Sequence, residues 1–296
     1  MKVLVTGTSG QLGYDVMEEL ARRGHEAVGA DRSESEGDFE KVQLDITDKE
    51  RVMEVVRDLK PEAIVHCAAW TNVDGAEAPE NLEKVRAVNV EGTRNLAEAA
   101  KEVGAKFVYI STDYVFDGSG EQPWEPDDKN YAPINVYGQS KLDGELAVKE
   151  ILDKYFIVRI AWVFGRNGKN FVKTMLEVGS KHEVVKVVDD QIGTPTYTYD
   201  LARLLVDMIE SDRYGYYHAT NEGGYISWAD FTEEIFRQAG IDSKVERVST
   251  EEYEKIAGKT VAKRPFNSRL DKSKLVEAGF EPLPTWQDAL GRYINS

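Results

Sequence analysis

The chain has 296 residues, 41% of them hydrophobic, and a formal net charge of −16. This length allows one large or two unequal domains with a substantial core. The acidic balance excludes nucleic acid and anionic membranes as partners, because either would require a basic surface. No apolar run reaches the roughly eighteen residues of a membrane span, and the amino terminus has the pattern of a strand rather than a signal peptide. We therefore expect a cytoplasmic protein.

The amino-terminal segment predicts a strand, a glycine-rich turn and a helix. Residues 2–6 are an apolar strand, and residues 14–24 form an amphipathic helix. The intervening glycines follow the spacing Gly-x-x-Gly-x-x-Gly. Glycines suit such a turn because they let bare backbone N–H groups, at the positive end of a helix, approach a pyrophosphate. We interpret the turn as a dinucleotide-binding site formed by Gly7, Ser9, Gly10, Gln11, Leu12 and Gly13.

The second strand, residues 26–30, is followed by Asp31. An acidic side chain at this position can hydrogen-bond the adenosine ribose hydroxyls and repel a 2′-phosphate, so it favours NAD(H). Arg32 comes next and offers a cation for that phosphate. NAD(H) is therefore the preferred cofactor, and NADP(H) is the second candidate.

Strands and helices continue to alternate along the chain. The predicted strands are residues 41–44, 63–67, 106–111 and 155–163, and the predicted helices are residues 51–59, 81–103 and 137–154. Repeated strand–helix–strand units predict an α/β fold, a Rossmann-type doubly wound parallel sheet with both faces covered. Residues 118–133, rich in Pro, Asp and Gly, predict a loop that is either a flap over a substrate or a passive surface segment.

Cysteine and histidine usage offers no support for a metal site. Cys67 is the single cysteine of the chain, cannot form an internal disulfide, and ends an apolar run, so we expect a buried small hydrophobe. The four histidines show no paired ligand spacing.

Two features point to a site that holds a carbonyl oxygen beside a proton donor. Ser111 and Thr112 end the strand that starts at residue 106, and the carboxyl ends of such strands face the ligand crevice, where a hydroxyl can hold a carbonyl oxygen. Tyr137 precedes Lys141 by one helical turn, so the ammonium is expected to lower the pKa of the phenol and make it a proton donor. The alternatives are a turn or cap role for the hydroxyls and a solvated lysine on a surface helix.

Beyond about residue 165 the alternation loosens. Residues 170–179 and 198–211 predict helices, and residues 184–188 and 216–220 predict strands. Tyr225, Trp228 and Phe231 lie at helical spacing and are expected in a core.

Seven segments together resemble one known family over nearly the whole chain. They are residues 7–13, 67–74, 111–118, 137–141, 159–165, 191–197 and 264–271. The first and fourth resemble the extended short-chain dehydrogenase/reductase superfamily in general. The segments Ser-Thr-Asp-Tyr-Val-Phe and Gly-Thr-Pro-Thr-Tyr are narrower, and with them the chain resembles the dTDP-4-dehydrorhamnose reductases.

This resemblance implies a reaction and assigns residues to it. A hydride would pass from the reduced nicotinamide to the 4-keto carbon of dTDP-4-dehydro-6-deoxy-L-mannose, giving dTDP-L-rhamnose. Tyr137 would give its proton to the developing alkoxide, Lys141 would bind the nicotinamide ribose, and Thr112 would hold the carbonyl oxygen. No metal is expected.

Further contacts are implied by the same resemblance. Asp45 and Ile46 match the adenine contact, and Ala68, Ala69 and Asn89 match positions that line the nicotinamide side and support the lysine. Positions that match sugar contacts are Thr71, Val73, Tyr114 and Trp162. The alternative for the small residues and for Trp162 is packing. Clustering alone suggests four residues for the substrate's base and diphosphate, namely Lys263, Arg264, Asn267 and Arg269.

The family pattern also implies a discontinuous domain boundary. We expect a dinucleotide-binding domain of residues 1–165 plus about 188–220, and a smaller carboxyl-terminal substrate domain of about 166–187 plus 221–296. Two other functions stay open: a reductase of another nucleotide-linked keto sugar, and a non-catalytic regulatory subunit of the methionine adenosyltransferase type. A homodimer is the default expectation for such an enzyme.

Overall fold

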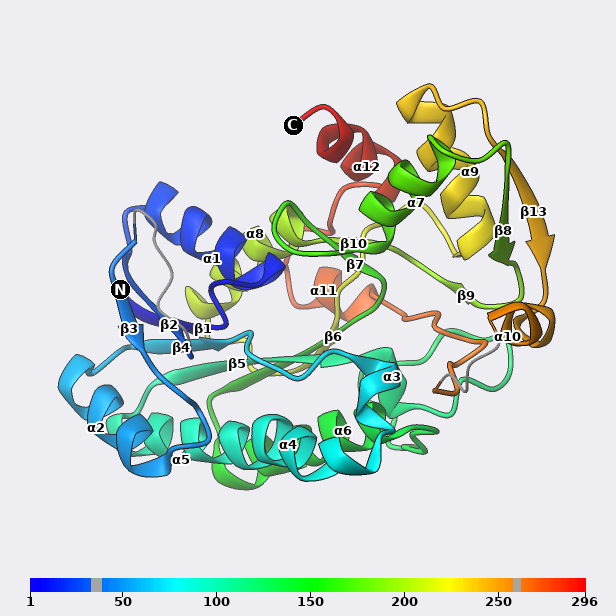
Figure 1. Ribbon diagram of the computed structural model, residues 1–296. Helices are drawn as coiled ribbons and strands as arrows, with labels where there is room; N and C mark the ends of the chain where they lie inside the picture. Colours follow the sequence, from blue (N-terminus) through cyan, green and yellow to red (C-terminus); the bar gives the residue numbers. More distant parts are fainter. Residues whose placement is uncertain (33–38, 258–261) are drawn as a thin grey trace.

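The computed structural model describes residues 1–32, 39–257 and 262–296. Within these residues one large sheet has seven parallel strands in the order β11-β6-β5-β4-β1-β2-β3 (Figure 1). The strands are β1 (Lys2–Thr6), β2 (Glu26–Asp31), β3 (Lys41–Gln43), β4 (Ala63–His66), β5 (Lys106–Thr112), β6 (Tyr155–Ile160) and β11 (Gly215–His218). The predicted Rossmann-type doubly wound sheet is confirmed.

Helices cover both faces of this sheet because alternate strand residues point to opposite sides. Val3 and Val5 of β1 pack in one core with the first group of helices, whereas Leu4 packs in a second core with the other group. The first group is α1 (Gln11–Arg22), α8 (Thr198–Ile209) and α11 (Ser273–Glu277), and the second is α2 (Lys49–Leu59), α5 (Thr93–Val103) and α6 (Val136–Ile151). Figure 1 shows α1 and α8 on one side of the sheet and α2, α5 and α6 on the other.

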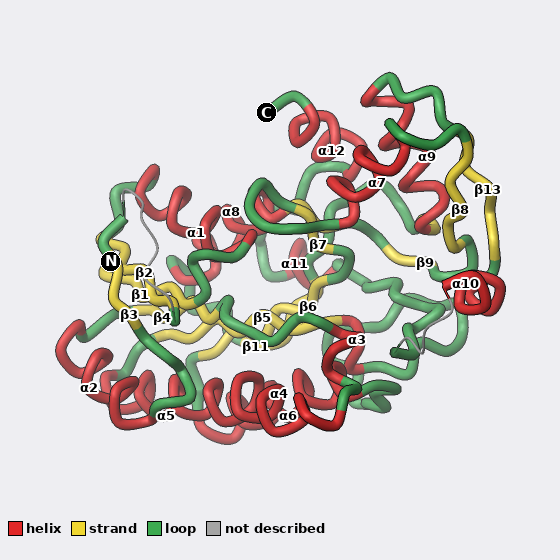
Figure 2. Tube along the Cα trace, in the orientation of Figure 1, coloured by secondary structure: helices red, strands yellow, loops and turns green. Residues whose placement is uncertain are grey.

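A smaller unit packs around its own aromatic core. Phe164, Phe231 and Trp286 are among the fully or almost fully buried members of this core. Its principal elements are α7 (Phe171–Gly179), β8 (Val184–Val188), α9 (Trp228–Ala239), β13 (Lys244–Val248), α10 (Thr250–Ala257) and α12 (Trp286–Ile294). Figure 2 shows the parallel pair β8 and β13 well apart from the large sheet. Short paired strands join the units: β7 (Val163–Phe164) with β10 (Thr196–Tyr197), and β9 (Ile192–Gly193) with β12 (Ile226–Ser227).

The chain moves between the two units more than once. After β8 it returns to the large unit to form α8 and β11. Leu275, Phe280 and Leu283 also pack in the core of the large unit, although they fall in the segment assigned to the smaller domain. The domain boundaries stay a prediction.

The helix predicted over residues 81–103 runs without a break from Leu82 to Val103, but it is not a regular α-helix throughout. This segment is divided into a 3₁₀ turn η1 (Pro79–Asn81), α4 (Leu82–Arg86), a π-helical turn η2 (Ala87–Gly92) and α5. Within this wider turn the consecutive residues Asn89 and Val90 are both buried, with exposed fractions of 1% and 5%.

Three smaller expectations are corrected. Helix α1 begins at Gln11 rather than residue 14, because Gly10 is its N-cap. Tyr225 precedes α9 and is exposed, since Ser227 starts that helix with a capping box, so it is not a core residue. Cys67 is only partly buried, but burial still raises the pKa of its thiol to about 12 and keeps the thiol protonated.

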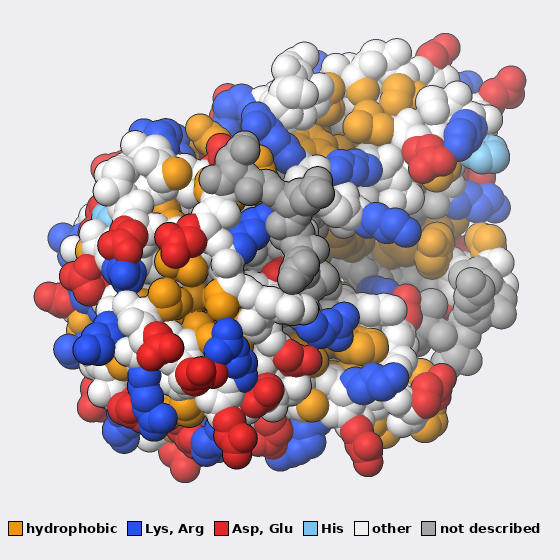
Figure 3. Space-filling model, turned by 60° about the vertical axis from the view of Figure 1, so that its left-hand side comes forward, with side chains coloured by type: hydrophobic (Ala, Val, Ile, Leu, Met, Phe, Trp, Pro, Cys, Tyr) orange, Lys and Arg blue, Asp and Glu red, His pale blue; other side chains and the backbone are white. Residues whose placement is uncertain are grey.

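Acidic and basic side chains are intermingled on the face shown in Figure 3, and a hollow opens between the two units. In the described parts of the chain, no helix combines the length and the apolar character needed to cross a bilayer.

Candidate active site

The glycine turn after β1 is closed on itself and packed tightly. Gly7 has φ +72°, and its carbonyl accepts a hydrogen bond of 3.0 Å from the Gly10 N–H. A Cβ on Gly7 would lie 2.7 Å from the Ala68 nitrogen, and a Cβ on Gly13 would overlap the Gly7 carbonyl. Ser9 and Gly10 are exposed at the start of α1. The turn thus fits a dinucleotide, because only bare backbone leaves room for a pyrophosphate at this helix terminus.

Asp31 ends β2 directly beside this turn. One of its carboxylate oxygens accepts a hydrogen bond of 3.0 Å from the Ser9 N–H, and the other accepts one of 2.8 Å from the Arg32 N–H. The carboxylate therefore lies next to the glycine turn, and its contact with an adenosine ribose stays a prediction. The segment that follows Arg32, residues 33–38, lies outside the described residues.

The residues expected at the adenine and nicotinamide follow β3 and β4. The Ile46 carbonyl accepts a hydrogen bond of 3.0 Å from Asn95, and the Asp45 carboxylate holds the Thr47 N–H and hydroxyl at 2.9 and 2.7 Å. Ala68 and Ala69 come just after β4 and are partly exposed. Their small side chains leave the backbone accessible next to the glycine turn.

Asn89 joins two parts of the site through its side chain. Its amide oxygen accepts a hydrogen bond of 2.7 Å from the Trp70 N–H, and its amide nitrogen donates to the Trp70 carbonyl and to the Ser140 hydroxyl, at 3.1 and 2.9 Å. Ser140 in turn donates to the Tyr137 carbonyl at 2.7 Å. The side chain of Asn89 thus holds Trp70 and Ser140 in place, and its role toward the cofactor stays a prediction.

A second series of hydrogen bonds, which the sequence analysis missed, passes through His66. His66 lies 2.8 Å from the Thr6 hydroxyl through Nδ1 and 3.0 Å from the Thr93 hydroxyl through Nε2. Thr93 donates to the Asn89 carbonyl, and Thr6 accepts from the Ala68 N–H. Because Thr93 uses its hydroxyl proton on Asn89, it must accept a hydrogen bond from His66, so the imidazole carries its proton on Nε2. The unprotonated Nδ1 accepts from the Thr6 hydroxyl. Burial lowers the pKa of His66 to about 3, and it stays neutral.

Thr112 and Tyr137 meet at the carboxyl end of the sheet. Thr112 ends β5, is 5% exposed, and donates to the Asp113 carboxylate at 2.9 Å. The Thr112 hydroxyl lies close enough to Tyr137 to oppose the rise in the pKa of its phenol. The Tyr114 ring packs edge-on against the Tyr137 ring at 5.7 Å between centroids. Ser111, the other hydroxyl residue at the end of β5, is buried, and its hydroxyl has no hydrogen-bond partner among the described residues.

The expected effect of Lys141 on Tyr137 does not appear. Burial is the main cause that raises the pKa of the Tyr137 phenol well above its ordinary value, and the Asp113 carboxylate adds to it. Burial lowers the pKa of Lys141 to about 7, although Glu145 works in the opposite direction. The Lys141 ammonium lies 4.1 Å from the centroid of the Tyr109 ring. Tyr137 therefore keeps its proton at neutral pH.

Lys141 should leave a signature in the pH dependence of stability. Its folded pKa of about 7 lies below its ordinary value of 10.5, so between these values the unfolded chain binds more protons and stability rises with pH. Cys67 makes stability fall with pH above its ordinary pKa of 9.0, because its folded pKa is raised to about 12. We expect the free energy of unfolding of the wild type to rise from pH 7 to 9, by up to about 1.4 kcal/mol per pH unit.

Urea denaturation of the wild type and of Lys141→Met at several pH values measures this slope. The variant should lose most of the rise, because it has no proton to release there. An equal slope in both proteins would show that Lys141 is not the group responsible.

Among the positions matched to the sugar, Tyr114 contacts the Tyr137 ring. Thr71 is exposed and Val73 is partly buried at the start of α3 (Val73–Ala76). Trp162 has the left-handed φ of +50° and stacks on Trp228 with 3.8 Å between ring centroids. A Cβ on Gly193 would lie 3.0 Å from both Trp162 and Ser268. Trp228 and Gly193 thus hold the Trp162 ring, and spacing did not reveal either of them.

Asp113 is a further group that the sequence reading left without a role. It starts the turn η3 (Asp113–Val115) and is 2% exposed. Burial raises the pKa of its carboxyl to about 6, while the Ser268 and Thr112 hydroxyls oppose this rise. It orients the Thr112 hydroxyl next to Tyr137.

The cluster near residue 264 is held mainly by the protein itself. Arg264 pairs with Asp74 at 2.9 Å, and Asn267 is 1% exposed and donates to the Ser119 and Gln122 carbonyls. Arg269 donates to Asn267 at 3.0 Å, and Lys263 is exposed. Asn267 therefore anchors the loop of residues 118–133. No cluster of three or more potential metal ligands occurs among the described residues.

Comparisons with known proteins agree over the whole chain. A family model described as the RmlD substrate binding domain matches residues 1–296. A dTDP-4-dehydrorhamnose reductase from Streptomyces griseus is 42% identical over 293 residues, which cover 97% of this chain and 91% of the relative.

Two solved structures are similarly close. A dTDP-4-dehydrorhamnose reductase from Clostridium acetobutylicum has 41% identity and a TM-score of 0.91, covering 100% of this chain and 99% of that chain. One from Bacillus anthracis, in complex with NADP, has 41% identity and a TM-score of 0.89, covering 99% of this chain and 98% of that chain.

The fold and the tyrosine–lysine site define an NAD(P)-dependent oxidoreductase of the extended short-chain dehydrogenase/reductase class. Within this class, the chain belongs to the dTDP-4-dehydrorhamnose reductase family, as its full-length relatives show.

Proposed function

We propose that this chain reduces the 4-keto group of dTDP-4-dehydro-6-deoxy-L-mannose to give dTDP-L-rhamnose, with NADH or NADPH as the reductant. The observation that carries the proposal is the meeting of Thr112 and Tyr137 at the carboxyl end of the sheet, with Lys141 in the same helix as Tyr137. The Lys141 charge acts on His66 and Cys67, which directly precede Ala68 at the glycine turn. Family membership supports the substrate.

The residues divide the work as follows. The reduced nicotinamide, when bound, supplies the hydride. Tyr137, which keeps its proton at neutral pH, gives that proton to the alkoxide oxygen of the substrate. Thr112 holds the same oxygen and is itself oriented by Asp113. Lys141 binds the nicotinamide ribose in this proposal.

The sugar side is proposed around Thr71, Val73, Tyr114 and Trp162. The Trp162 ring offers a flat apolar face to the 6-deoxy methyl and the sugar C–H groups, and its stacking on Trp228 holds that face in place. Residues 1–165 plus about 188–220 form the cofactor domain in this proposal, and the remainder forms the substrate side. We also propose that the enzyme is a homodimer. We propose a cytoplasmic location for it, where both dinucleotides and nucleotide sugars are made.

The test is oxidation of NADH and of NADPH, followed by absorbance, with the keto sugar generated in place by its upstream dehydratase and epimerase. We expect rapid turnover with dTDP-L-rhamnose as the product, identified by mass spectrometry and NMR. Cofactor binding without turnover on this substrate would reject the proposal. Turnover on a different nucleotide-linked keto sugar would redirect it, and co-purification with a synthetase would favour the regulatory role.

Asp31 should govern the choice of cofactor. Asp31→Asn keeps an acceptor for the Ser9 N–H but removes the negative charge that repels a 2′-phosphate. We expect the ratio of kcat/KM for NADH to that for NADPH to fall by about tenfold, the effect of about 1.4 kcal/mol. Asp58→Asn, on the exposed side of α2, is the matched control. An unchanged ratio would assign cofactor selection to Arg32 instead.

A further inference from the structure

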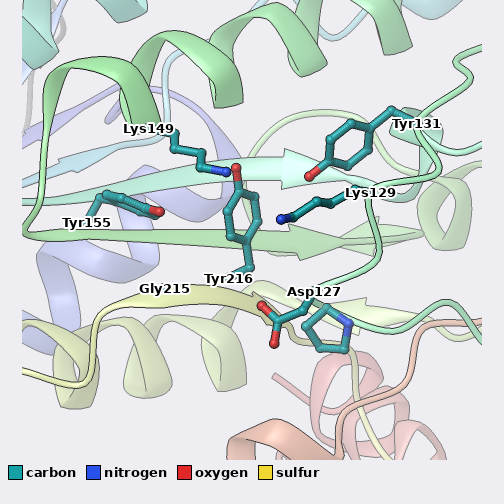
Figure 4. A pocket seen from close by; sticks show the side chains of 8 residues that line it. Asp127, Lys129, Tyr131, Lys149, Tyr155, Gly215 and Tyr216 are labelled. Carbon is teal, nitrogen blue, oxygen red and sulfur yellow. The ribbon is translucent and has the colours of Figure 1, made fainter.

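A cavity of about 240 Å³ lies beside the edge strand β11, separate from the active site. It is bounded by α6, by the end of the loop of residues 118–133, and by the first residues of β6 and β11. The active-site residues gather instead at the carboxyl ends of the strands. Its polar lining consists of Asp127, Lys129, Tyr131, Lys149, Tyr155 and Tyr216 (Figure 4).

The phenol of Tyr216 is the first sign that the cavity is a binding site. Tyr216 is 8% exposed, and its buried hydroxyl has no hydrogen-bond partner among the described residues. Leaving a buried hydroxyl unpaired costs about 1–3 kcal/mol. The ring cannot easily turn away, because the Arg159 guanidinium lies 4.9 Å from its centroid and the Tyr155 ring meets it edge-on at 6.0 Å.

Two exposed lysines, Lys149 and Lys129, lie beside the Tyr216 ring, and the Lys149 ammonium is 6.0 Å from the ring centroid. Figure 4 shows Lys149 reaching from α6 toward the Tyr216 hydroxyl and Lys129 entering from the loop side. Neither lysine forms an ion pair within the described parts of the chain. Asp127, the acidic residue of the lining, is bound by Lys274, whose ammonium lies 2.7 Å from both carboxylate oxygens.

The charges identify the ligand class. A cation enclosed by the three tyrosines would face two ammonium groups, which excludes it. An apolar ligand would leave the buried Tyr216 hydroxyl without an acceptor. Oxygen acceptors with negative charge satisfy all three donors at once, and charge-assisted hydrogen bonds of this kind are the strong ones. Lys129 and Lys149 thus place two positive charges at this cavity, although the chain as a whole has a net charge of −16.

We propose that this cavity binds a small polyanion of about the size of pyrophosphate, held by the Lys129 and Lys149 ammonium groups and the Tyr216 hydroxyl. Phosphate-type and carboxylate-type ligands share this chemistry. The site is independent of the keto-sugar reaction, because none of these three residues belongs to the proposed catalytic or cofactor-binding set.

The proposal is tested by isothermal titration of the full chain with pyrophosphate and with citrate at constant ionic strength. Saturating NADPH is present throughout, so that the glycine turn is already occupied. We expect saturable binding of at least one of the two anions. Tighter binding of pyrophosphate would identify a phosphate ligand, and tighter binding of citrate would identify a carboxylate ligand.

Two variants locate the binding. Tyr216→Phe removes only the unpaired hydroxyl and should weaken binding about tenfold, and Lys149→Gln should weaken it at least as much. Lys101→Gln, on the exposed side of α5, is the control and should bind like the wild type. Thermal unfolding of Tyr216→Phe should match or exceed that of the wild type, so loss of fold does not confuse the result. Absence of saturable binding, or binding that neither cavity variant weakens, would overturn the proposal.

Discussion

Replacing Tyr137 by Phe is expected to lower kcat for keto-sugar reduction by about a hundredfold to ten-thousandfold. The change removes one oxygen atom, which in the proposal gives its proton to the substrate alkoxide. Binding of NADPH should be nearly unchanged, because the glycine turn, Asp31 and Lys141 remain in place. Steady-state kinetics give kcat, and a fluorescence titration with NADPH gives the dissociation constant.

A tyrosine of the smaller unit provides the matched control. Tyr253 is exposed on α10, and Tyr253→Phe should turn over at the wild-type rate. Full activity of Tyr137→Phe would remove Tyr137 from the mechanism. A loss confined to NADPH affinity would instead make it a cofactor contact.

Replacing Glu145 by Gln is expected to destabilise the fold by about 3–5 kcal/mol. Glu145 and Arg159 are both fully buried and form two hydrogen bonds of 2.8 Å, one through each carboxylate oxygen. The amide keeps the shape of the side chain but leaves the guanidinium charge uncompensated between Phe116 and Tyr216. Urea denaturation followed by circular dichroism measures the change.

The same helix supplies a control for this prediction. Glu150 lies on the exposed side of α6 and pairs with Arg94 at 3.0 Å. Solvent screens this pair, so Glu150→Gln should cost less than about 1 kcal/mol. Similar losses in the two variants would mean that burial of the Glu145–Arg159 pair carries no special energetic weight.

Local signals explain why much of the fold was predictable. The strand, glycine turn and helix at the amino terminus depend on glycine spacing and on apolar periodicity, both of which are visible in the sequence. The parallel sheet follows from alternating strands and helices, since each crossover helix must cover a face. Thr112, Tyr137 and Asp31 were located because strand ends and helical spacing determine where their side chains lie.

The remainder depends on contacts between distant segments. The π-helical turn at Asn89 serves partners at Trp70 and Ser140, and no local pattern announces it. His66 acquires its role from Thr6 and Thr93, far away along the chain. The effect of Lys141 on Tyr137 was misjudged because helical spacing gives proximity, whereas burial dominates the pKa of both groups.

The return of the chain to the large sheet also constrains how the protein is made. Strand β11 completes the sheet edge beside β6, and α8 supplies Leu201, Leu204 and Leu205 to the core that contains Val3 and Val5. A nascent chain that has emerged only as far as β7 would therefore expose one sheet face and an unpaired edge. Val3 and Val5, which are synthesised first, become buried only after the residues of α8 have emerged. Such long-range closure predicts slow folding and a need for chaperone protection during translation.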